Sequence, residues 1–225
     1  MNESVETPRR NLTGAIIPAL AAAGLAALGA ILLVSRNGDA SKSAEAPIVE
    51  NCIQENADAV GGPIELVESN GATVTQADFA GEPAVIYFGF THCPDICPTS
   101  MYALEAALAQ PGGYDVQPVL VSLDPERDTP AVMGQYVQTS GFPSGLVGLT
   151  GSRAQIDAAK AAFHVYSARA PIEGVPDGAY NVDHSSFLYV VDGQWRTRSI
   201  VNTVGATPEQ VAQCIAAGLD RAESS

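Results

Sequence analysis

The segment at residues 84–98, AVIYFGFTHCPDICP, predicts the centre of the fold. Its first part, residues 84–90, is a continuous apolar run rich in β-branched and aromatic side chains, which is typical of a strand buried on both faces of a sheet. Cys93 and Cys97 follow the run, and a helix is expected to begin at or near Pro98. The segment therefore predicts a central strand that leads through a short thiol-bearing loop into a helix.

Strand and helix patterns alternate on both sides of this segment. Further strands are expected at residues 64–68, 116–123, 187–191 and 195–201. Helices are expected at residues 99–109, after Asp128-Thr129-Pro130, after Ser152 and after Thr207. The last two begin with capping boxes, in which a Ser or Thr is followed three residues later by Gln. This order predicts an α/β domain with a mixed central sheet flanked by helices.

The composition excludes several classes of protein. The chain has 225 residues, with 11 Lys and Arg against 25 Asp and Glu, which gives a net charge of −14. Nearly all of that charge lies in residues 47–225, and a domain this acidic repels phosphate backbones, so nucleic acid is not expected as a partner. A hydrophobic content of 46% excludes a wholly disordered chain. Four cysteines are too few for a small disulfide scaffold of this length.

Residues 12–34, from Leu12 to Val34, carry no charge and are expected to form a transmembrane anchor. As a helix they would be about 34 Å long, enough to cross a hydrocarbon layer of about 30 Å. A cleaved signal peptide is the nearest alternative, although its apolar region would be shorter. Basic residues flank the segment evenly and leave its orientation open. We therefore expect a short tail at 1–11, the anchor, a flexible tether at 35–46 and a folded domain at 47–225.

Cys93 and Cys97 are predicted to lie on the loop after a buried strand and at the start of the following helix. The unpaired N–H groups and the dipole of a helix start favour thiolate over thiol. A thiolate serves equally as a metal ligand and as a redox nucleophile, so the pair alone leaves both chemistries open.

Three histidines are available to complete a metal site. His184 is the strongest candidate because it stands just before the apolar strand at 187–191, where loops converge at the rim of a sheet. A hydrogen-bonded loop histidine is the competing interpretation. His92 adjoins Cys93, and that neighbouring position favours a ring that points away from the thiols. His164 follows a predicted helix and is interpreted as a structural or surface residue.

Four motifs, in order and spacing, resemble the Sco/SenC family: THCPDICP at 91–98, VSLDPERDTP at 121–130, LTG at 149–151 and DHS at 183–185. The resemblance covers roughly residues 61–201, and the combined motifs are much more specific than the CxxxC spacing alone. Leu123 stands where valine is common in the family. The region around Cys214 lies outside the family pattern.

The resemblance implies a thioredoxin-like fold that is tethered by an N-terminal helix and lies outside the cytoplasm. That place is the periplasmic side of a bacterial inner membrane or the mitochondrial intermembrane space. The family binds one copper ion, Cu(I) or Cu(II), which implies Cys93, Cys97 and His184 as the ligands. It matures the binuclear copper centre of cytochrome c oxidase subunit II, which implies that subunit and other copper chaperones as partners.

The donor chemistry agrees with copper, although the residues alone also permit zinc. Two thiolates and an imidazole suit Cu(I), and three ligands leave a side open for exchange, whereas a structural zinc site normally closes with four. Asp95 lies between the thiols and Asp183 beside the imidazole. Each is either a hydrogen-bond acceptor that tunes the site or a solvated loop carboxylate. Asp124 is expected near the site, and Asp128 is interpreted first as part of a helix start.

Several functions remain open at this point, and so does the question of whether the chain is an enzyme. The main alternative to a copper chaperone is a thiol–disulfide oxidoreductase that uses Cys93 and Cys97 as its redox pair to keep the oxidase subunit's cysteines reduced. Dedicated thioredoxin-like enzymes use CxxC instead. A peroxidase of related fold would need an arginine to match Thr91, and none is recognised. A purely structural tethered module is the plainest alternative.

Cys52 and Cys214 are candidates for a structural disulfide. Cys52 lies just after the tether, and Cys214 lies on the inward stripe of the last predicted helix. In an oxidising compartment the two thiols can pair. The competing interpretation is a buried free Cys214 and an incidental Cys52.

Overall fold

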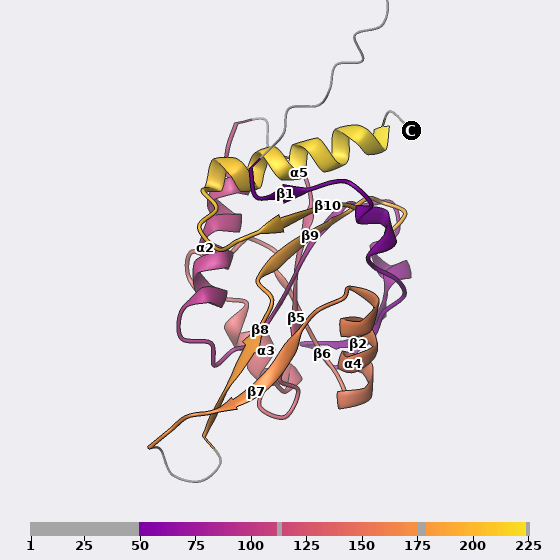
Figure 1. Cartoon of the computed structure of the whole chain (residues 1–225). Coiled ribbons are helices and arrows are strands. Elements are labelled where there is room, and N and C mark those ends of the chain that lie inside the picture. Colours follow the sequence, from indigo (N-terminus) through magenta and orange to yellow (C-terminus); the bar gives the residue numbers. More distant parts are fainter. Residues whose placement is uncertain (1–49, 112–113, 175–178, 224–225) are drawn as a thin grey trace, which may run out of the picture. The chain divides into compact units, whose positions relative to one another are not determined.

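The computed structural model describes residues 50–111, 114–174 and 179–223, and its main feature is a mixed sheet of eight strands (Figure 1). The strand order is β1-β10-β9-β4-β5-β6-β2-β3, in which β4, β5 and β6 run parallel and the other neighbours antiparallel. The bounds are β1 Cys52–Ile53, β2 Glu65–Glu68, β3 Thr73–Thr75, β4 Ala84–Gly89, β5 Gln117–Ser122, β6 Val147–Thr150, β9 Phe187–Val191 and β10 Thr197–Asn202. The predicted mixed α/β fold is confirmed.

Strand β4 lies in the middle of the sheet, and all six of its residues are buried. Its side chains alternate between two covered faces. Tyr87 points to the face that carries the thiols, where its hydroxyl lies 2.9 Å from that of Ser186. Phe88 packs on the other face against Phe163, with ring centroids 5.4 Å apart. Because both faces are covered, the strand is apolar throughout, as a two-sided strand must be.

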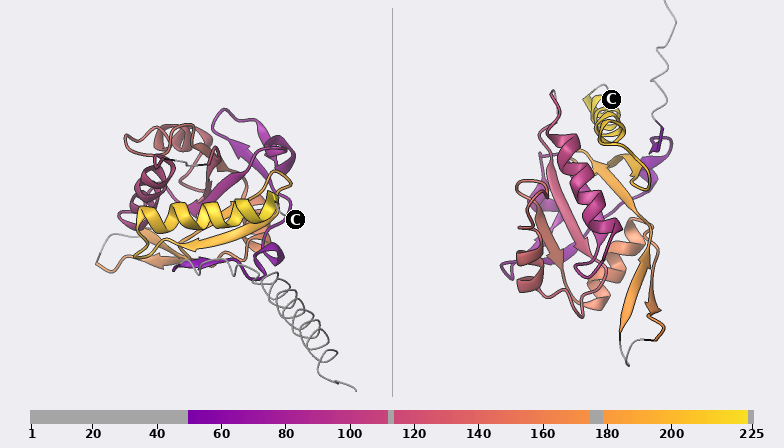
Figure 2. Two further views of the ribbon diagram at one scale, coloured as in Figure 1. Left: turned by 90° about the horizontal axis from the view of Figure 1, so that it is seen from above. Right: turned by 90° about the vertical axis from the view of Figure 1, so that its left-hand side faces the viewer.

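Helices cover the sheet, and their starts follow the predicted caps. Their bounds are α2 Ile96–Leu108, α3 Pro130–Tyr136, α4 Arg153–Ala162 and α5 Pro208–Glu223, with short 3₁₀ helices at η1 Ala57–Ala59 and η2 Gln76–Phe79. Helix α5 packs along β9 and β10 and lies beside α2 (Figure 2). The capping boxes at Ser152 and Thr207 both form with Gln155 and Gln210. Thr129 caps α3 through the N–H of Val132.

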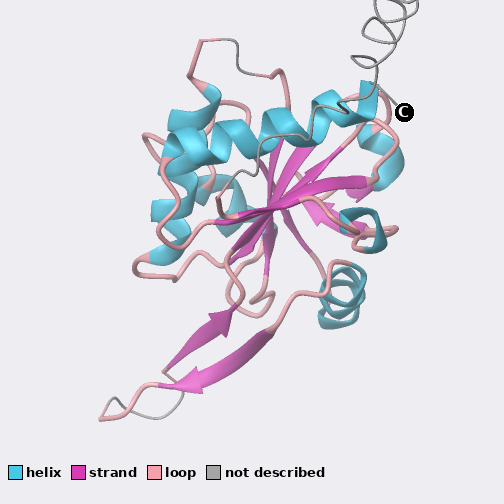
Figure 3. Ribbon diagram, turned by 45° about the horizontal axis from the view of Figure 1, so that its top comes forward, coloured by secondary structure: helices cyan, strands magenta, loops and turns pink. Residues whose placement is uncertain are grey.

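A second, two-stranded sheet was not predicted. Strands β7, Ser167–Pro171, and β8, Tyr180–His184, form an antiparallel hairpin that projects away from the main sheet (Figure 3). His184 was expected on a loop before β9, whereas it is the last residue of β8. Tyr180 and Val182 alternate with polar residues in β8, but β7 offers only the small side chains of Ala168 and Ala170, so the pattern is too short and weak to mark two strands.

A disulfide joins the two ends of the described domain. Cys52 of β1 pairs with Cys214 of α5 across 162 residues of sequence, with their Cα atoms 5.5 Å apart. Cys214 is fully buried, as its place on the inward stripe of the helix requires. Of the two interpretations offered by the sequence, the structure agrees with the disulfide between Cys52 and Cys214.

The predicted membrane anchor at residues 12–34 lies outside the described residues. Among the residues that the structure describes, no helix has the length and apolar character needed to span a bilayer.

Candidate metal centre

Two thiols lie side by side at the start of α2. Cys93 belongs to the loop after β4, and Cys97 lies in the first turn of the helix. The backbone N–H of Cys97 donates to Sγ of Cys93 over 3.3 Å. Both residues are free cysteines; Cys93 is 9% exposed and Cys97 is fully buried. The sulfur of Cys93 therefore lies near the surface of the site, and the sulfur of Cys97 lies beneath it.

His184 completes the group from the other sheet. Its Nε2 atom lies 3.4 Å from Sγ of Cys97, and the donor atoms of Cys93, Cys97 and His184 all lie within 4.8 Å of one another. The imidazole packs edge-on against Tyr87 and Phe90, with ring centroids 6.1 Å and 5.8 Å away. The three predicted residues are thus brought together, with the imidazole held between two aromatic rings.

A backbone carbonyl fixes the tautomer of that imidazole. Nδ1 of His184 lies 2.8 Å from the carbonyl oxygen of Ser185. A carbonyl only accepts, so Nδ1 carries the proton of the neutral ring and the lone pair of Nε2 faces the thiols. Asp95 and Asp183, proposed from sequence as candidate acceptors, are both exposed, and Asp95 instead accepts from the hydroxyl of Thr99 over 3.4 Å.

The two thiols differ in acidity. The hydrogen bond from the Cys97 thiol, helped by the side chain of His184 and by the backbone N–H groups of Asp95 and Cys97, outweighs burial and lowers the pKa of Cys93 to about 4. The same hydrogen bond, together with burial and the charge of Cys93, raises the pKa of Cys97 well above its ordinary value. In the reduced, metal-free protein Cys93 is the thiolate and Cys97 the thiol.

The close approach of β4 to the buried thiol requires a glycine. A Cβ atom at Gly89 would lie 3.0 Å from Sγ of Cys97 and 2.9 Å from Cε1 of Tyr87. Both distances are shorter than an ordinary van der Waals contact, so any larger residue would displace the sulfur or the ring.

A buried carboxylate fixes the start of the thiol loop. Asp128 is fully buried and accepts hydrogen bonds from the backbone N–H of Thr91 (3.1 Å), from the Thr91 hydroxyl (2.6 Å) and from the Ser122 hydroxyl (2.6 Å). From the sequence Asp128 was interpreted as part of a helix start, but the cap of α3 is Thr129. The sequence signal for this role is an acidic residue shortly after a buried strand. Its contact with the thiol loop is visible only in the structure.

A second buried carboxylate anchors the hairpin that carries His184. Asp124 is fully buried and accepts from the Tyr180 hydroxyl over 2.8 Å and from the Arg127 guanidinium. Arg127 also donates to the carbonyl of Tyr180 over 3.0 Å and stacks on its ring, 3.8 Å from the centroid. We call Asp124, Arg127 and Tyr180 the hairpin anchor. The hairpin anchor ties Tyr180, the first residue of β8, to the loop after β5. Asp124 was expected near the site, and it lies there as part of this anchor.

The other histidines lie elsewhere. His92 has a half-exposed side chain whose Nδ1 pairs with the Thr91 hydroxyl over 3.0 Å. His164 is exposed just after α4, with φ +53°, the left-handed conformation that often ends a helix. His164 is therefore the surface residue that the sequence predicted.

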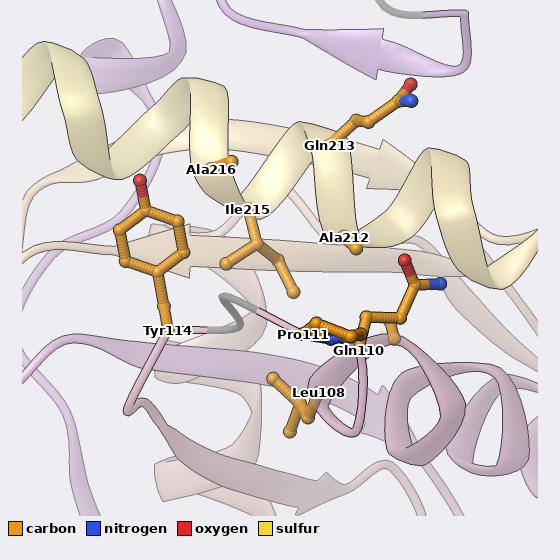
Figure 4. A pocket seen from close by; sticks show the side chains of 9 residues that line it. Leu108, Gln110, Pro111, Tyr114, Ala212, Gln213, Ile215 and Ala216 are labelled. Atoms are coloured by element: carbon orange, nitrogen blue, oxygen red, sulfur yellow. The ribbon is translucent and has the colours of Figure 1, made fainter.

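Two cavities differ in what they can bind. A cleft of about 300 Å³ lies between residues 93–96 of the thiol loop and residues 181–184 of β8, so it opens directly onto the three donor atoms. A smaller apolar pocket of about 180 Å³ lies between α2 and α5, where Leu108, Tyr114 and Ile215 line it (Figure 4). It contacts the last turn of α2, whereas Cys97 lies in the first turn and Cys93 in the loop before it. Its described lining residues include no Cys, His, Asp or Glu. Of the two, only the first cleft offers metal-binding or redox groups.

Known proteins are similar to this chain in sequence and in fold. Residues 53–220 match the family model described as SCO1/SenC. Protein SenC of Rhodobacter capsulatus is 39% identical over 163 residues, covering 72% of this chain and 71% of that protein. The mitochondrial protein SCO1 homolog 1 of Arabidopsis thaliana is 41% identical over 136 residues, covering 59% of this chain but only 39% of that protein.

A solved structure extends the similarity to the fold. The crystal structure of Arabidopsis thaliana ScoI with copper bound matches with a TM-score of 0.66 and 34% sequence identity, covering 72% of this chain and 99% of that one. The match of the family model runs from β1 to α5 and includes all three donor residues. With most of its length and its characteristic motifs matched, the chain belongs to the SCO1/SenC family.

Proposed function

We propose that this chain binds one copper ion, Cu(I) or Cu(II), through Cys93, Cys97 and His184, and that it serves the assembly of cytochrome c oxidase. The convergence of the three donor atoms, from the loop after β4, from α2 and from β8, to within 4.8 Å of one another carries this proposal. Two sulfurs and an imidazole form a soft donor set that suits Cu(I). The copper bound to the Arabidopsis relative supports the choice of metal.

The surroundings of the donors favour a metal that is passed on over one that is kept. Three protein ligands leave one side open, and the cleft of about 300 Å³ meets them on that side. Cys93 is already a thiolate, whereas Cys97 has to release its proton when metal binds, so loading couples to proton release. The carbonyl of Ser185 keeps Nε2 of His184 available as a donor.

A copper titration tests this site. The reduced full chain in detergent is titrated with Cu(I) against a chromophoric chelator, alongside Cys93→Ala, Cys97→Ala and His184→Ala variants. The expected stoichiometry is one ion per chain, and each variant is expected to lose tight binding. His164→Ala is the matched control and should bind like the parent, since its imidazole lies after α4. Unchanged affinity in His184→Ala would refute the three-ligand site.

The asymmetry of the thiol pair favours a second candidate function, thiol–disulfide exchange. The thiolate of Cys93 would attack a disulfide of the oxidase subunit and form a mixed disulfide, releasing one thiolate of the partner. Cys97 would then lose its proton, attack Sγ of Cys93 and release the second partner thiolate. Two electrons pass from the Cys93–Cys97 pair, which ends as a disulfide, to the partner, which ends as a dithiol. His184→Ala should retain this exchange while losing tight copper binding.

We extend the proposal to location and partners. Residues 12–34 anchor the chain, and residues 47–225 form the domain outside the cytoplasm, in the periplasm or the intermembrane space; the uncharged stretch of 23 residues supports this. The partners are oxidase subunit II, whose binuclear copper centre is matured, and the copper chaperones that supply the metal. Alkaline extraction that released the chain from membranes would contradict the anchor. Copper-loaded chain that failed to build the centre in the reduced, copper-free subunit would contradict delivery.

A further inference from the structure

One edge of strand β8 is not covered by another strand among the described residues. Two hydrogen bonds bracket the β7–β8 ladder, from the N–H of Ser185 to the carbonyl of Tyr166 (3.1 Å) and from the N–H of Ile172 to the carbonyl of Ala179 (3.2 Å). In an antiparallel ladder the bonded pairs alternate, so the other bonded residues of β8 are Asn181 and Asp183. The backbone groups of the residues between them point to the opposite edge.

That edge faces the thiols. The carbonyl of Tyr180, which belongs to it, accepts from Arg127 in the loop after β5. Further along, Val182 and His184 line the cleft opposite residues 93–96, and the alternation of the ladder puts their N–H and carbonyl groups on this edge. No hydrogen bond within the described residues engages these four groups. Val182 is only 5% exposed, so a partner can reach its backbone groups only through the cleft that this residue lines.

We propose that an extended segment of the partner polypeptide, bearing a cysteine, pairs with this edge as a third strand of the β7–β8 sheet. An uncovered strand edge with unpaired donors and acceptors is the standard template for such pairing. A partner residue opposite His184 would have its Cα about 5.5 Å away and its side chain on the same face as the imidazole. A cysteine there would bring its sulfur to the open side of the three donors.

The cleft also selects the charge of the segment. Asp95 and Asp183 are both exposed and both line it, and none of its eight described lining residues is lysine or arginine. Like charge repels an acidic segment and opposite charge attracts a basic one, so lysine or arginine should flank the cysteine. The role of the partner's cysteine, as a metal ligand or as an exchange partner, rests on the proposed function. The backbone pairing of the segment with β8 does not.

Backbone N-methylation tests the pairing directly. The probe is a fluorescent nine-residue peptide of alternating threonine and valine, with a central cysteine and a lysine at each end. Two further peptides are N-methylated, one at both first neighbours of the cysteine and the other at both second neighbours. Because alternate N–H groups of a strand face opposite edges, only one of the two should lose hydrogen bonds to β8. Binding to the reduced, metal-free full chain in detergent is measured by fluorescence anisotropy.

The expected result is that one methylated peptide binds at least about tenfold more weakly than the parent while the other is unchanged. Equal binding of all three peptides, equal weakening of both methylated peptides, or no binding of the parent at millimolar concentration would each overturn the pairing. The same contrast is expected with serine in place of the cysteine. The test of the backbone pairing is therefore independent of copper binding and of thiol exchange.

A protein variant gives a second measurement. Val182→Pro removes the N–H that faces the cleft, and Val182→Thr keeps it with a side chain of the same shape. Val182→Pro should weaken the parent peptide about tenfold or more, while Val182→Thr leaves it within a factor of about two. Equal affinity of the two variants would contradict the proposal. If the proline variant does not fold, the contrast between the methylated peptides still decides.

Discussion

A single methyl group at Gly89 should impair the metal site more than it impairs the fold. The new Cβ would lie 3.0 Å from Sγ of Cys97 and 2.9 Å from Cε1 of Tyr87, whereas ordinary contacts begin near 3.4 Å. Tyr87 is held by its hydrogen bond to Ser186, and Cys97 is held in the first turn of α2. Relief therefore requires a displacement of about 0.4–0.5 Å, shared between a tethered ring and the sulfur.

The expected magnitudes follow from that displacement. Overpacking of this size in a core lowers the free energy of unfolding by about 1–3 kcal/mol. A metal site tolerates shifts of only about 0.2 Å in its ligand distances, so the copper affinity of Gly89→Ala should fall by about 10- to 100-fold. Gly148→Ala is the matched control. Its Cβ would lie 2.8 Å from Cγ1 of Val137, so it overpacks the contact between β6 and α3 without touching a donor residue.

Urea unfolding of the metal-free proteins and Cu(I) competition titrations measure the two effects separately. Both variants should lose comparable stability, and only Gly89→Ala should lose copper affinity. If Gly89→Ala bound copper within twofold of the parent, the proposed role of β4 in placing the buried sulfur would be wrong. That role would be equally wrong if Gly148→Ala lost as much copper affinity as Gly89→Ala.

Three further outcomes are expected. Replacing Cys52 and Cys214 by serine removes a disulfide that links residues 162 positions apart in the sequence, and it should lower the free energy of unfolding in urea by at most about 5 kcal/mol. The copper stoichiometry should not change. Tyr180→Phe removes a 2.8 Å hydrogen bond to the buried Asp124 and should cost about 1.5–3 kcal/mol, with faster hydrogen exchange in β8. With its pKa lowered to about 4, Cys93 in the metal-free protein should react with iodoacetamide at nearly the same rate from about pH 6 to pH 8, whereas an ordinary thiol would speed up about 80-fold.

The sequence predicts the thiol side of the site well because the signals there are local. The buried strand, the loop with Cys93 and the start of α2 are contiguous in the chain. The helix start was predicted at or near Pro98, and α2 begins at Ile96, two residues earlier. Proline is tolerated at the third helical position because the N–H groups of the first turn have no partner within the helix.

The imidazole side could not be predicted in the same way. The alternation in β8 is limited to Tyr180 and Val182, and β7 has only small apolar side chains, so the sequence signal is weak. The hairpin is held by tertiary contacts, among them those of Asp124 and Arg127 with Tyr180. The group that orients His184 is a backbone carbonyl, which no pattern of side chains reveals. From the residues alone His184 was the strongest of the three histidines but still competed with the interpretation as an ordinary loop histidine, and the family resemblance decided for it.

This division of the site bears on how its two candidate functions coexist. Both thiols belong to the rigid core: Cys97 is in α2, and Asp128 fixes the start of the loop that carries Cys93. Both thiols lie outside the hairpin, so the dithiol itself exists wherever the hairpin stands, although the side chain of His184 contributes to the lowered pKa of Cys93. Copper binding additionally needs the hairpin, since it supplies the third donor. A single change in the position of β8 would therefore separate metal binding from thiol chemistry, and the hairpin anchor is the element that resists that change.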